Sequence, residues 1–208
     1  MPAHHTFHRH RGYHGHSLHS AGFTLPELLI VLCIIGILLA AGVPSFRTYL
    51  QTQQVITASS QFMFALNLAR SEAIQRGARV DLGPRDGLHW ENGWVVFVNK
   101  PRDSQPQFDT GDELIYSYDD RIPGLQVATT LSDKSYPYIA YNGNGRPRSN
   151  LNALTPQWGS WQFSLNSKER VVRITLAGRA RLCNPADDAS CRFSGTSSGS
   201  STAMPDDH

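Results

Sequence analysis

The chain has 208 residues, of which 40% are hydrophobic and 17% charged, and its formal net charge at pH 7 is +2. A total charge this small excludes a protein that attracts polyanions through its overall charge, so any such affinity must come from a local cluster. The sequence has no P-loop, no convincing dinucleotide-binding fingerprint and no Ser–His–Asp ordering, and we expect no enzyme activity.

The first 22 residues are polar and basic. They contain Arg9, Arg11 and seven of the nine histidines, but no acid. The excess of positive charge predicts that this end stays in the cytoplasm. Removing residues 1–22 would lower the formal charge from +2 to 0. It would also remove the histidine cluster, so we expect no metal site and no cofactor.

Residues 23–43 form an apolar run whose one charged residue is Glu27. As a helix with a rise of ~1.5 Å per residue, the run would be about 31 Å long, which is enough to cross a bilayer. A carboxylate in hydrocarbon costs roughly 2.5 kcal/mol or more, so Glu27 is expected to have a dedicated partner. The pattern predicts a membrane-spanning segment over residues 23–44.

The residues around this acid, Gly22-Phe23-Thr24-Leu25-Pro26-Glu27-Leu28-Leu29, resemble the leader signal of type IV prepilins and type II secretion pseudopilins. The resemblance implies that the prepilin peptidase/methyltransferase cleaves between Gly22 and Phe23 and methylates the amine of Phe23. It also implies that Glu27 pairs with the terminal amine of a neighbouring subunit during filament assembly. Pro26 is compatible with a first helical turn, where its missing N–H would be unpaired anyway.

The same resemblance implies where the protein resides and what it contacts. It implies a single-pass protein of the bacterial inner membrane with its head in the periplasm, later assembled with other major and minor pilins or pseudopilins. The competing interpretation is an ordinary signal peptide, cleaved near Leu39-Ala40-Ala41-Gly42 to release a secreted protein. That interpretation leaves Glu27 unexplained.

Beyond Pro44 the pattern becomes amphipathic, with apolar residues at three- and four-residue spacing. They are Val55, Ala58, Phe62, Leu66, Ala69 and Ala73. Gly77 is suited to end the helix, so we predict one helix over about 23–76 whose amphipathic half spans 45–77. Residues 68–77 resemble the FimT/GspH branch of minor pilins. We interpret Arg70, Glu72 and Arg76 as a solvated helix face with weak ion pairs.

The remaining head, residues 78–193, has the pattern of short strands separated by Gly, Pro, Asn and Asp. The predicted strands are 80–82, 94–98, 114–118, 125–128, 138–141, 161–165 and 171–176. We therefore expect an α+β, type IV pilin-like fold, in which the long N-terminal helix packs on a head of two small antiparallel sheets. Residues 194–208 are rich in Ser and Gly and are predicted to be disordered.

Some aromatic and acidic side chains could suggest base stacking or calcium binding, but a structural role is the better interpretation for both groups. The aromatic residues Trp90, Trp94, Tyr136, Tyr138, Trp158 and Trp161 are assigned to the core rather than to base stacking. The carboxylates of residues 108–113 lack EF-hand spacing, so we interpret them as an acidic turn.

The three cysteines divide by position. Cys33 lies in the apolar run and is interpreted as a small apolar residue there. Cys183 and Cys191 lie in what would be an oxidising periplasm, which favours a disulfide. Two free thiols are the alternative, and two cysteines without a nearby histidine make a poor metal site.

The strongest local charge lies next to this cysteine pair. Residues 168–181 contain five bases, Lys168, Arg170, Arg173, Arg179 and Arg181, against the single acid Glu169, a net charge of +4. If residues 171–181 run extended, Arg173, Arg179 and Arg181 point to one side, unless a bulge at Gly178 intervenes. Arginine suits phosphate because its planar fork donates two parallel hydrogen bonds.

Gly178-Arg179-Ala180-Arg181 also resembles the Gly-Arg-x-Arg element of FimT-type minor pilins. The resemblance implies sequence-independent binding of DNA for uptake in natural transformation. We expect Arg179 and Arg181 to bind the phosphates, assisted by Arg173, in a site that also includes Gly178, Arg170 and Lys168, with Arg146 and Arg148 as additional contacts if their loop lies nearby. The competing interpretations are an edge strand that carries positive charge against aggregation, and a structural pseudopilin of type II secretion without DNA binding.

Overall fold

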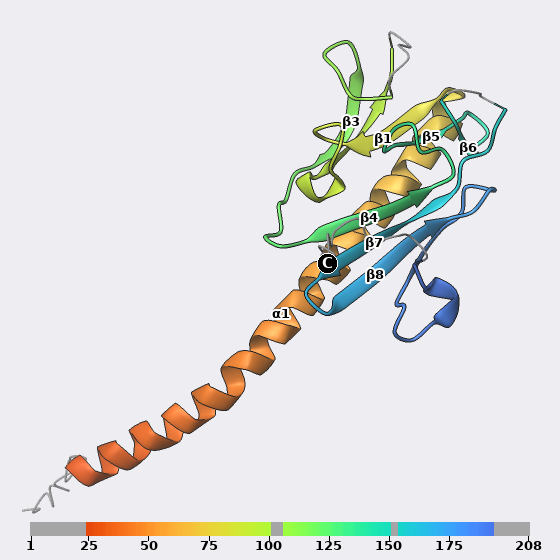
Figure 1. Ribbon diagram of the computed structural model, residues 1–208. Coiled ribbons are helices and arrows are strands. Elements are labelled where there is room, and N and C mark those ends of the chain that lie inside the picture. Colours follow the sequence, from red (N-terminus) through yellow and green to blue (C-terminus); the bar gives the residue numbers. More distant parts are fainter. Residues whose placement is uncertain (1–23, 101–105, 151–153, 194–208) are drawn as a thin grey trace, which may run out of the picture. The chain divides into compact units, whose positions relative to one another are not determined.

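The computed structural model describes residues 24–100, 106–150 and 154–193 (Figure 1). The predicted cleavage site at Gly22 and Phe23, the leader and the tail of residues 194–208 lie outside the described residues. The chain divides into two compact units, Met1–Pro44 and Ser45–His208. The buried core of the described residues lies entirely in the second unit, which is therefore a domain with its own core.

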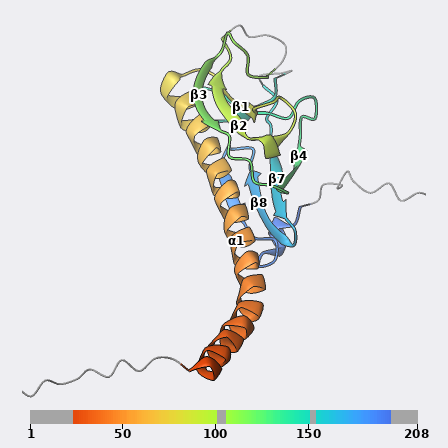
Figure 2. The same cartoon turned by 90° about the vertical axis from the view of Figure 1, so that its left-hand side faces the viewer.

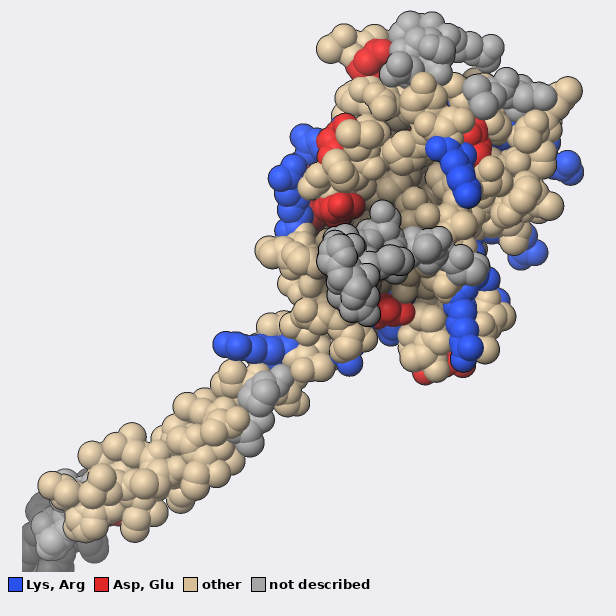
Figure 3. Space-filling model, viewed as in Figure 1, with Lys and Arg blue, Asp and Glu red and all other residues tan. Residues whose placement is uncertain are grey.

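The first unit contains the N-terminal part of α1, a helix that spans Leu25–Arg76. Glu27 lies in its first turn, and the Leu28 amide donates to the Thr24 carbonyl at 3.2 Å. The described side chains over residues 25–43 are all exposed, and Figure 3 shows this stretch without a lysine or arginine. By length and composition the helix can cross a membrane. Exposure of an apolar surface this long is expected of a segment that lipid or other subunits cover.

In the second unit, α1 presents one buried face to the head. The six residues predicted from their spacing are each at most 1% exposed, so the amphipathic prediction is confirmed. The helix ends where expected, because Gly77 adopts a φ of +60° and the Ala78 amide donates back to the Ala73 carbonyl at 3.2 Å. This pair of features is the glycine-terminated helix end that satisfies a terminal carbonyl.

Nine strands in the described part of the chain form two antiparallel sheets, which lie along the C-terminal half of α1 (Figures 1 and 2). The five-stranded sheet has the order β3 (Glu113–Tyr118), β2 (Trp94–Val98), β1 (Val80–Pro84), β5 (Ile139–Tyr141) and β6 (Pro147–Arg148). The four-stranded sheet has the order β4 (Gln126–Leu131), β7 (Gly159–Leu165), β8 (Lys168–Ile174) and β9 (Ala180–Cys183). The predicted strands are present with shifted ends, whereas β6 and β9 were not predicted as separate strands.

Phe62 of α1 lies at the centre of the core. Its ring centroid lies 5.0–5.4 Å from those of Trp90, Trp94, Trp161 and Phe163, which come from both sheets and from the short 3-10 helix Trp90–Asn92. Edge-on and tilted ring pairs at these separations are favourable beyond the area they bury. The helix and both sheets therefore share one core.

Two of the six aromatic residues assigned to the core are not fully buried. Trp90, Trp94, Tyr138 and Trp161 are at most 2% exposed, as predicted. Trp158, however, is 47% exposed and Tyr136 is only partly buried. For Trp158 the prediction was wrong, because the residue lies just before β7 and outside the run of inward-facing positions.

The acidic segment forms a turn held by its own carboxylates. Asp112 accepts from the amides of Lys100 at 3.1 Å and Asp109 at 3.0 Å. Glu113 pairs with Lys100 at 2.9 Å and with Arg76 at 2.7 Å. Hydrogen bonds from Lys100 and then Arg76 lower the pKa of Glu113 to about 2. These contacts confirm the interpretation as an acidic turn.

Candidate nucleic-acid interface

The basic segment is a hairpin rather than one extended strand. In the β8–β9 pair Arg173 lies opposite Arg181 and Ile174 opposite Ala180. The chain reverses at residues 175–179, where the Gly178 amide donates to the Thr175 carbonyl at 2.8 Å and Gly178 has a φ of +77°. The condition of an extended run over residues 171–181 is therefore not met, because Gly178 makes a turn rather than a bulge.

The hairpin nevertheless places Arg173 and Arg181 on one side of the sheet. Val172 and Ile174 face the core, so their neighbour Arg173 points to the opposite, outward face. Residues directly opposite each other in an antiparallel pair share a face, which puts Arg181 beside Arg173. Arg179 lies two residues before Arg181, exposed in the turn.

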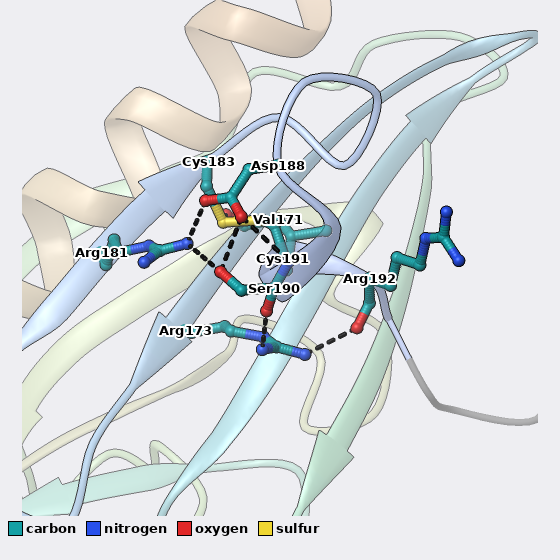
Figure 4. Close-up of polar contacts among 8 residues, drawn as sticks. All are labelled: Val171, Arg173, Arg181, Cys183, Asp188, Ser190, Cys191 and Arg192. Atoms are coloured by element: carbon teal, nitrogen blue, oxygen red, sulfur yellow. Dashed lines mark hydrogen bonds and ion pairs between the residues drawn. A yellow bond between two sulfur atoms is a disulfide. The ribbon is translucent and has the colours of Figure 1, made fainter.

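The guanidinium groups of Arg173 and Arg181 are held by the segment that follows β9 (Figure 4). Arg173 donates to the carbonyls of Ser190 at 2.5 Å and Arg192 at 2.6 Å. Arg181 pairs with Asp188 at 2.5 Å and donates to the Ser190 hydroxyl at 3.0 Å. Hydrogen bonds from Ser190 and the charge of Arg181 lower the pKa of Asp188, so this pair is charged at neutral pH.

A disulfide closes that segment onto the hairpin. Cys183 and Cys191 are bonded, with their Cα atoms 6.2 Å apart, which confirms the predicted pairing. Cys191 ends the 3-10 helix Ala189–Cys191 and is fully buried, as is Val171. Residues 184–190, which we call the disulfide loop, thus cover part of the outward face of β8 and supply most of the partners of Arg173 and Arg181.

The tip of the hairpin packs against a second turn, which joins β5 to β6. A Cβ atom placed on Gly178 would lie 2.5 Å from the Gly145 carbonyl and 3.0 Å from Pro147 Cδ. Gly145 has a φ of +68°, and the Asn142 side chain accepts from the Arg146 amide at 3.0 Å. The contact therefore needs glycine at position 178, and it brings Arg146 next to the turn that carries Arg179. Arg148 lies on β6 and is partly buried.

Arg70 of α1 lies beneath both turns. Its Nη2 donates to the Ala177 carbonyl at 3.3 Å, and its Nε is buried and would lie 3.2 Å from a Cβ on Gly145. The prediction of a solvated helix face is wrong for Arg70, although Glu72 and Arg76 do form an ion pair at 2.8 Å. Sequence spacing gave no signal for this role, because both contacts come from residues far along the chain.

Lys168 and Arg170 lie at the other end of the hairpin. They line an open pocket with Thr52, Asn184 and Pro185. Ile174 lies six positions after Lys168, a distance of about 20 Å along β8. The structure thus divides the predicted cluster into three parts: Arg179 with Arg146 at the tip, Arg173 with Arg181 under the disulfide loop, and Lys168 with Arg170 at the far end.

Comparisons with known proteins match both halves of the chain. The family model described as type II transport protein GspH matches residues 58–180, and the prokaryotic N-terminal methylation motif matches residues 18–43. A fimbrial protein of Pseudomonas aeruginosa is 44% identical over 59 residues, which are 28% of this chain and 38% of that protein. The chain thus matches less than two fifths of that relative's length.

Two solved structures are similar. The type IV minor pilin FimU of Pseudomonas aeruginosa has a TM-score of 0.50 and 18% identity over 64% of this chain and 91% of FimU. The minor pseudopilin EpsH of the type 2 secretion system of Vibrio cholerae has a TM-score of 0.40 and 16% identity over 65% of this chain and 98% of EpsH. The likeness to FimU supports the fold, a long helix packed on antiparallel sheets.

Proposed function

Because the chain belongs to the GspH family of type IV minor pilins and pseudopilins, we propose that it is a minor pilin that binds DNA through the tip of its β8–β9 hairpin. The N-terminal methylation motif and the apolar helix agree with processing by the prepilin peptidase, anchoring in the membrane and assembly with other pilins.

We further propose cleavage after Gly22, methylation of Phe23 and a pairing of Glu27 with the terminal amine of a neighbouring subunit. The head then lies in the periplasm before assembly. We propose no catalytic role.

The observation that carries the proposal is the contact between the two turns that bear Arg179 and Arg146. Both residues are exposed, and neither makes an ion pair with a carboxylate in residues 24–100, 106–150 and 154–193. Each turn is held by its own hydrogen bonds, and the two turns lie against each other. A guanidinium group without an ion-pair partner can bind two phosphate oxygens without first breaking a salt bridge. Such contacts read the backbone and not the base sequence, which fits the uptake of any DNA.

The number of free guanidinium groups at the tip sets the strength of binding that we expect. Two phosphate contacts predict a slope of about −1.8 for log affinity against log salt on duplex DNA. Arg173 and Arg181 add to this slope only if they leave their partners in or beside the disulfide loop, which would bring it to about −3.6. One subunit should therefore bind weakly, and firm capture needs several copies or several kinds of pilin.

The proposal is tested with the head unit, residues 45–208, and a labelled DNA duplex in fluorescence-anisotropy titrations at several salt concentrations. We expect salt-sensitive binding that is lost in the double variant Arg179→Ala/Arg146→Ala. Arg47→Ala/Arg121→Ala is the matched control, because it also removes two exposed charges, one from α1 and one from the β3–β4 connection, outside the hairpin. Absence of wild-type binding at low salt would refute DNA binding by the head.

The second candidate is a minor pseudopilin with a structural role in type II secretion. It is favoured by the description of the family model that matches residues 58–180. In that case the hairpin arginines contact other subunits. Pull-down of partner pilins or pseudopilins that depends on Arg179, together with absence of DNA binding, would support this candidate over the first.

A further inference from the structure

Trp158 lies on the same outward face of the four-stranded sheet as the hairpin arginines. In β7, Trp161, Phe163 and Leu165 point to the core. Trp158 extends the pairing of β7 with β4 by one residue. Its backbone carbonyl accepts from the Ser132 amide at 2.9 Å, and its backbone amide donates to the Ser132 hydroxyl at 3.0 Å. The alternation along the strand therefore directs the indole outward.

The register places this indole close to the tip of the hairpin. Ser160 pairs with Arg173 and Gly159 with Ile174, so the next position opposite Trp158 is Thr175. The Thr175 amide in turn donates to the Arg179 carbonyl at 3.1 Å. Trp158 and Arg179 are thus separated by two strand spacings, about 10 Å, with Arg173 diagonal to the indole.

Trp158 differs from the other three tryptophans in its surroundings. Those three are at most 2% exposed and all pack on Phe62 in the core, whereas Trp158 is 47% exposed. In the described part of the chain, none of the aromatic ring pairs includes Trp158. Leu176, in the turn beside it, is also exposed, at 54%. The arginine tip is therefore bordered by an apolar, aromatic surface.

We propose that Trp158 stacks on a base of single-stranded DNA whose backbone phosphates are bound at Arg179, so that the site prefers single strands to uninterrupted duplex. This inference rests on the proposed function and names its substrate class. Proteins bind single strands by combining cationic groups with exposed aromatic rings. Here the guanidinium would bind the phosphate and the indole would stack on the base. In a duplex the base faces are already stacked, so there the indole gains nothing.

The test compares three labelled probes of equal length on the head unit, residues 45–208: a 20-nucleotide thymidine strand, a 20-mer abasic strand and a 20-base-pair duplex. The abasic strand keeps the phosphates and lacks the bases. We expect wild type to bind the thymidine strand more tightly than the abasic one, and Trp158→Ala to remove this difference, on the order of tenfold. Trp158→Phe, which keeps a ring, should retain most of it, and the affinities for the duplex and the abasic strand should not change.

Each result separates this inference from the function on which it rests. Binding of duplex and abasic strand that depends on Arg179, with no change in any probe for Trp158→Ala, overturns base stacking and leaves phosphate binding intact. Equal weakening of all three probes in Trp158→Ala also overturns it, because the residue then acts on the fold of the tip. If no probe binds wild type, both proposals fail. If Trp158→Ala weakens only binding to another pilin, the indole is a protein contact and stacking is refuted.

Discussion

Removing the disulfide should lower the stability of the head and at the same time expose more of its positive charge. The perturbation is Cys183→Ala/Cys191→Ala in the head unit. The bond joins residues separated by eight positions, and the loop-entropy relation gives a loss of about 2.5 kcal/mol for so short a loop. The alanine at position 191 leaves a buried site incompletely filled, which adds to this loss.

The same change acts on two arginines. The partners of Arg173 and Arg181 are Asp188, Ser190 and Arg192, which lie in the disulfide loop or directly after it. Opening the loop frees two guanidinium groups on the outward face. Each can then add about 0.9 to the magnitude of the salt slope on duplex DNA, which takes it from about −1.8 toward −3.6.

Urea unfolding at 25 °C and anisotropy titrations over a salt series measure the two effects on one sample. Wild type in a reducing agent should reproduce both, and the double variant should not respond to the reductant. A loss of stability below about 1 kcal/mol would refute the loop-closure argument. A shallower salt slope, or loss of binding in a variant that is still folded, would show instead that the disulfide loop itself forms part of the DNA site.

Two further predictions concern residues outside the hairpin. Arg70→Met should cost about 0.5–1.5 kcal/mol in urea unfolding, because the hydrogen bond from Nη2 to the exposed Ala177 carbonyl is lost. It should weaken DNA binding without changing the salt slope, since Arg70 supports the two turns and is not itself a phosphate contact, and a changed slope would contradict this role. The lowered pKa of Glu113, about 2 in the folded state, means that this carboxylate stabilises the head above pH 4.5 and loses that effect as the pH falls toward 2. Unfolding midpoints of Glu113→Gln and wild type should therefore converge at low pH, and a constant difference would refute the pairing with Lys100 and Arg76.

Much of the fold follows from patterns that are local in the sequence. The apolar run, the helical spacing from Val55 to Ala73 and the strand at residues 94–98 each depend on the period of a single element, and each was predicted. The hairpin was not, because Gly178 permits both a bulge and a turn. The choice between them depends on the contact of Gly178 with Gly145, which comes from another sheet.

The charge pattern alone also overstated the number of basic side chains that are free to bind a ligand. Residue counting gave five bases in one segment, but it did not reveal that the carbonyls of Ser190 and Arg192 and the carboxylate of Asp188 hold two of them. Strand alternation puts Trp158 and Trp161, three residues apart, on opposite faces, but the predicted strand began at residue 161 and left Trp158 outside it. Burial and pairing are properties of the assembled sheet, so the sequence predicted the kinds of residue at the site but not which of them are free.

The two arginines at the tip come from different sheets, so the proposed site needs the whole head. Arg146 lies on the turn between β5 and β6 of the five-stranded sheet, whereas Arg179 lies on the turn between β8 and β9 of the four-stranded sheet. Two glycines allow these turns to touch, and Arg70 of α1 contacts both from below. A hairpin peptide with the same Gly-Arg-Ala-Arg sequence would lack the second turn and the helix, so it would not hold a second arginine at a fixed distance from Arg179. The amphipathic half of α1 thus supports the proposed binding site as well as the core.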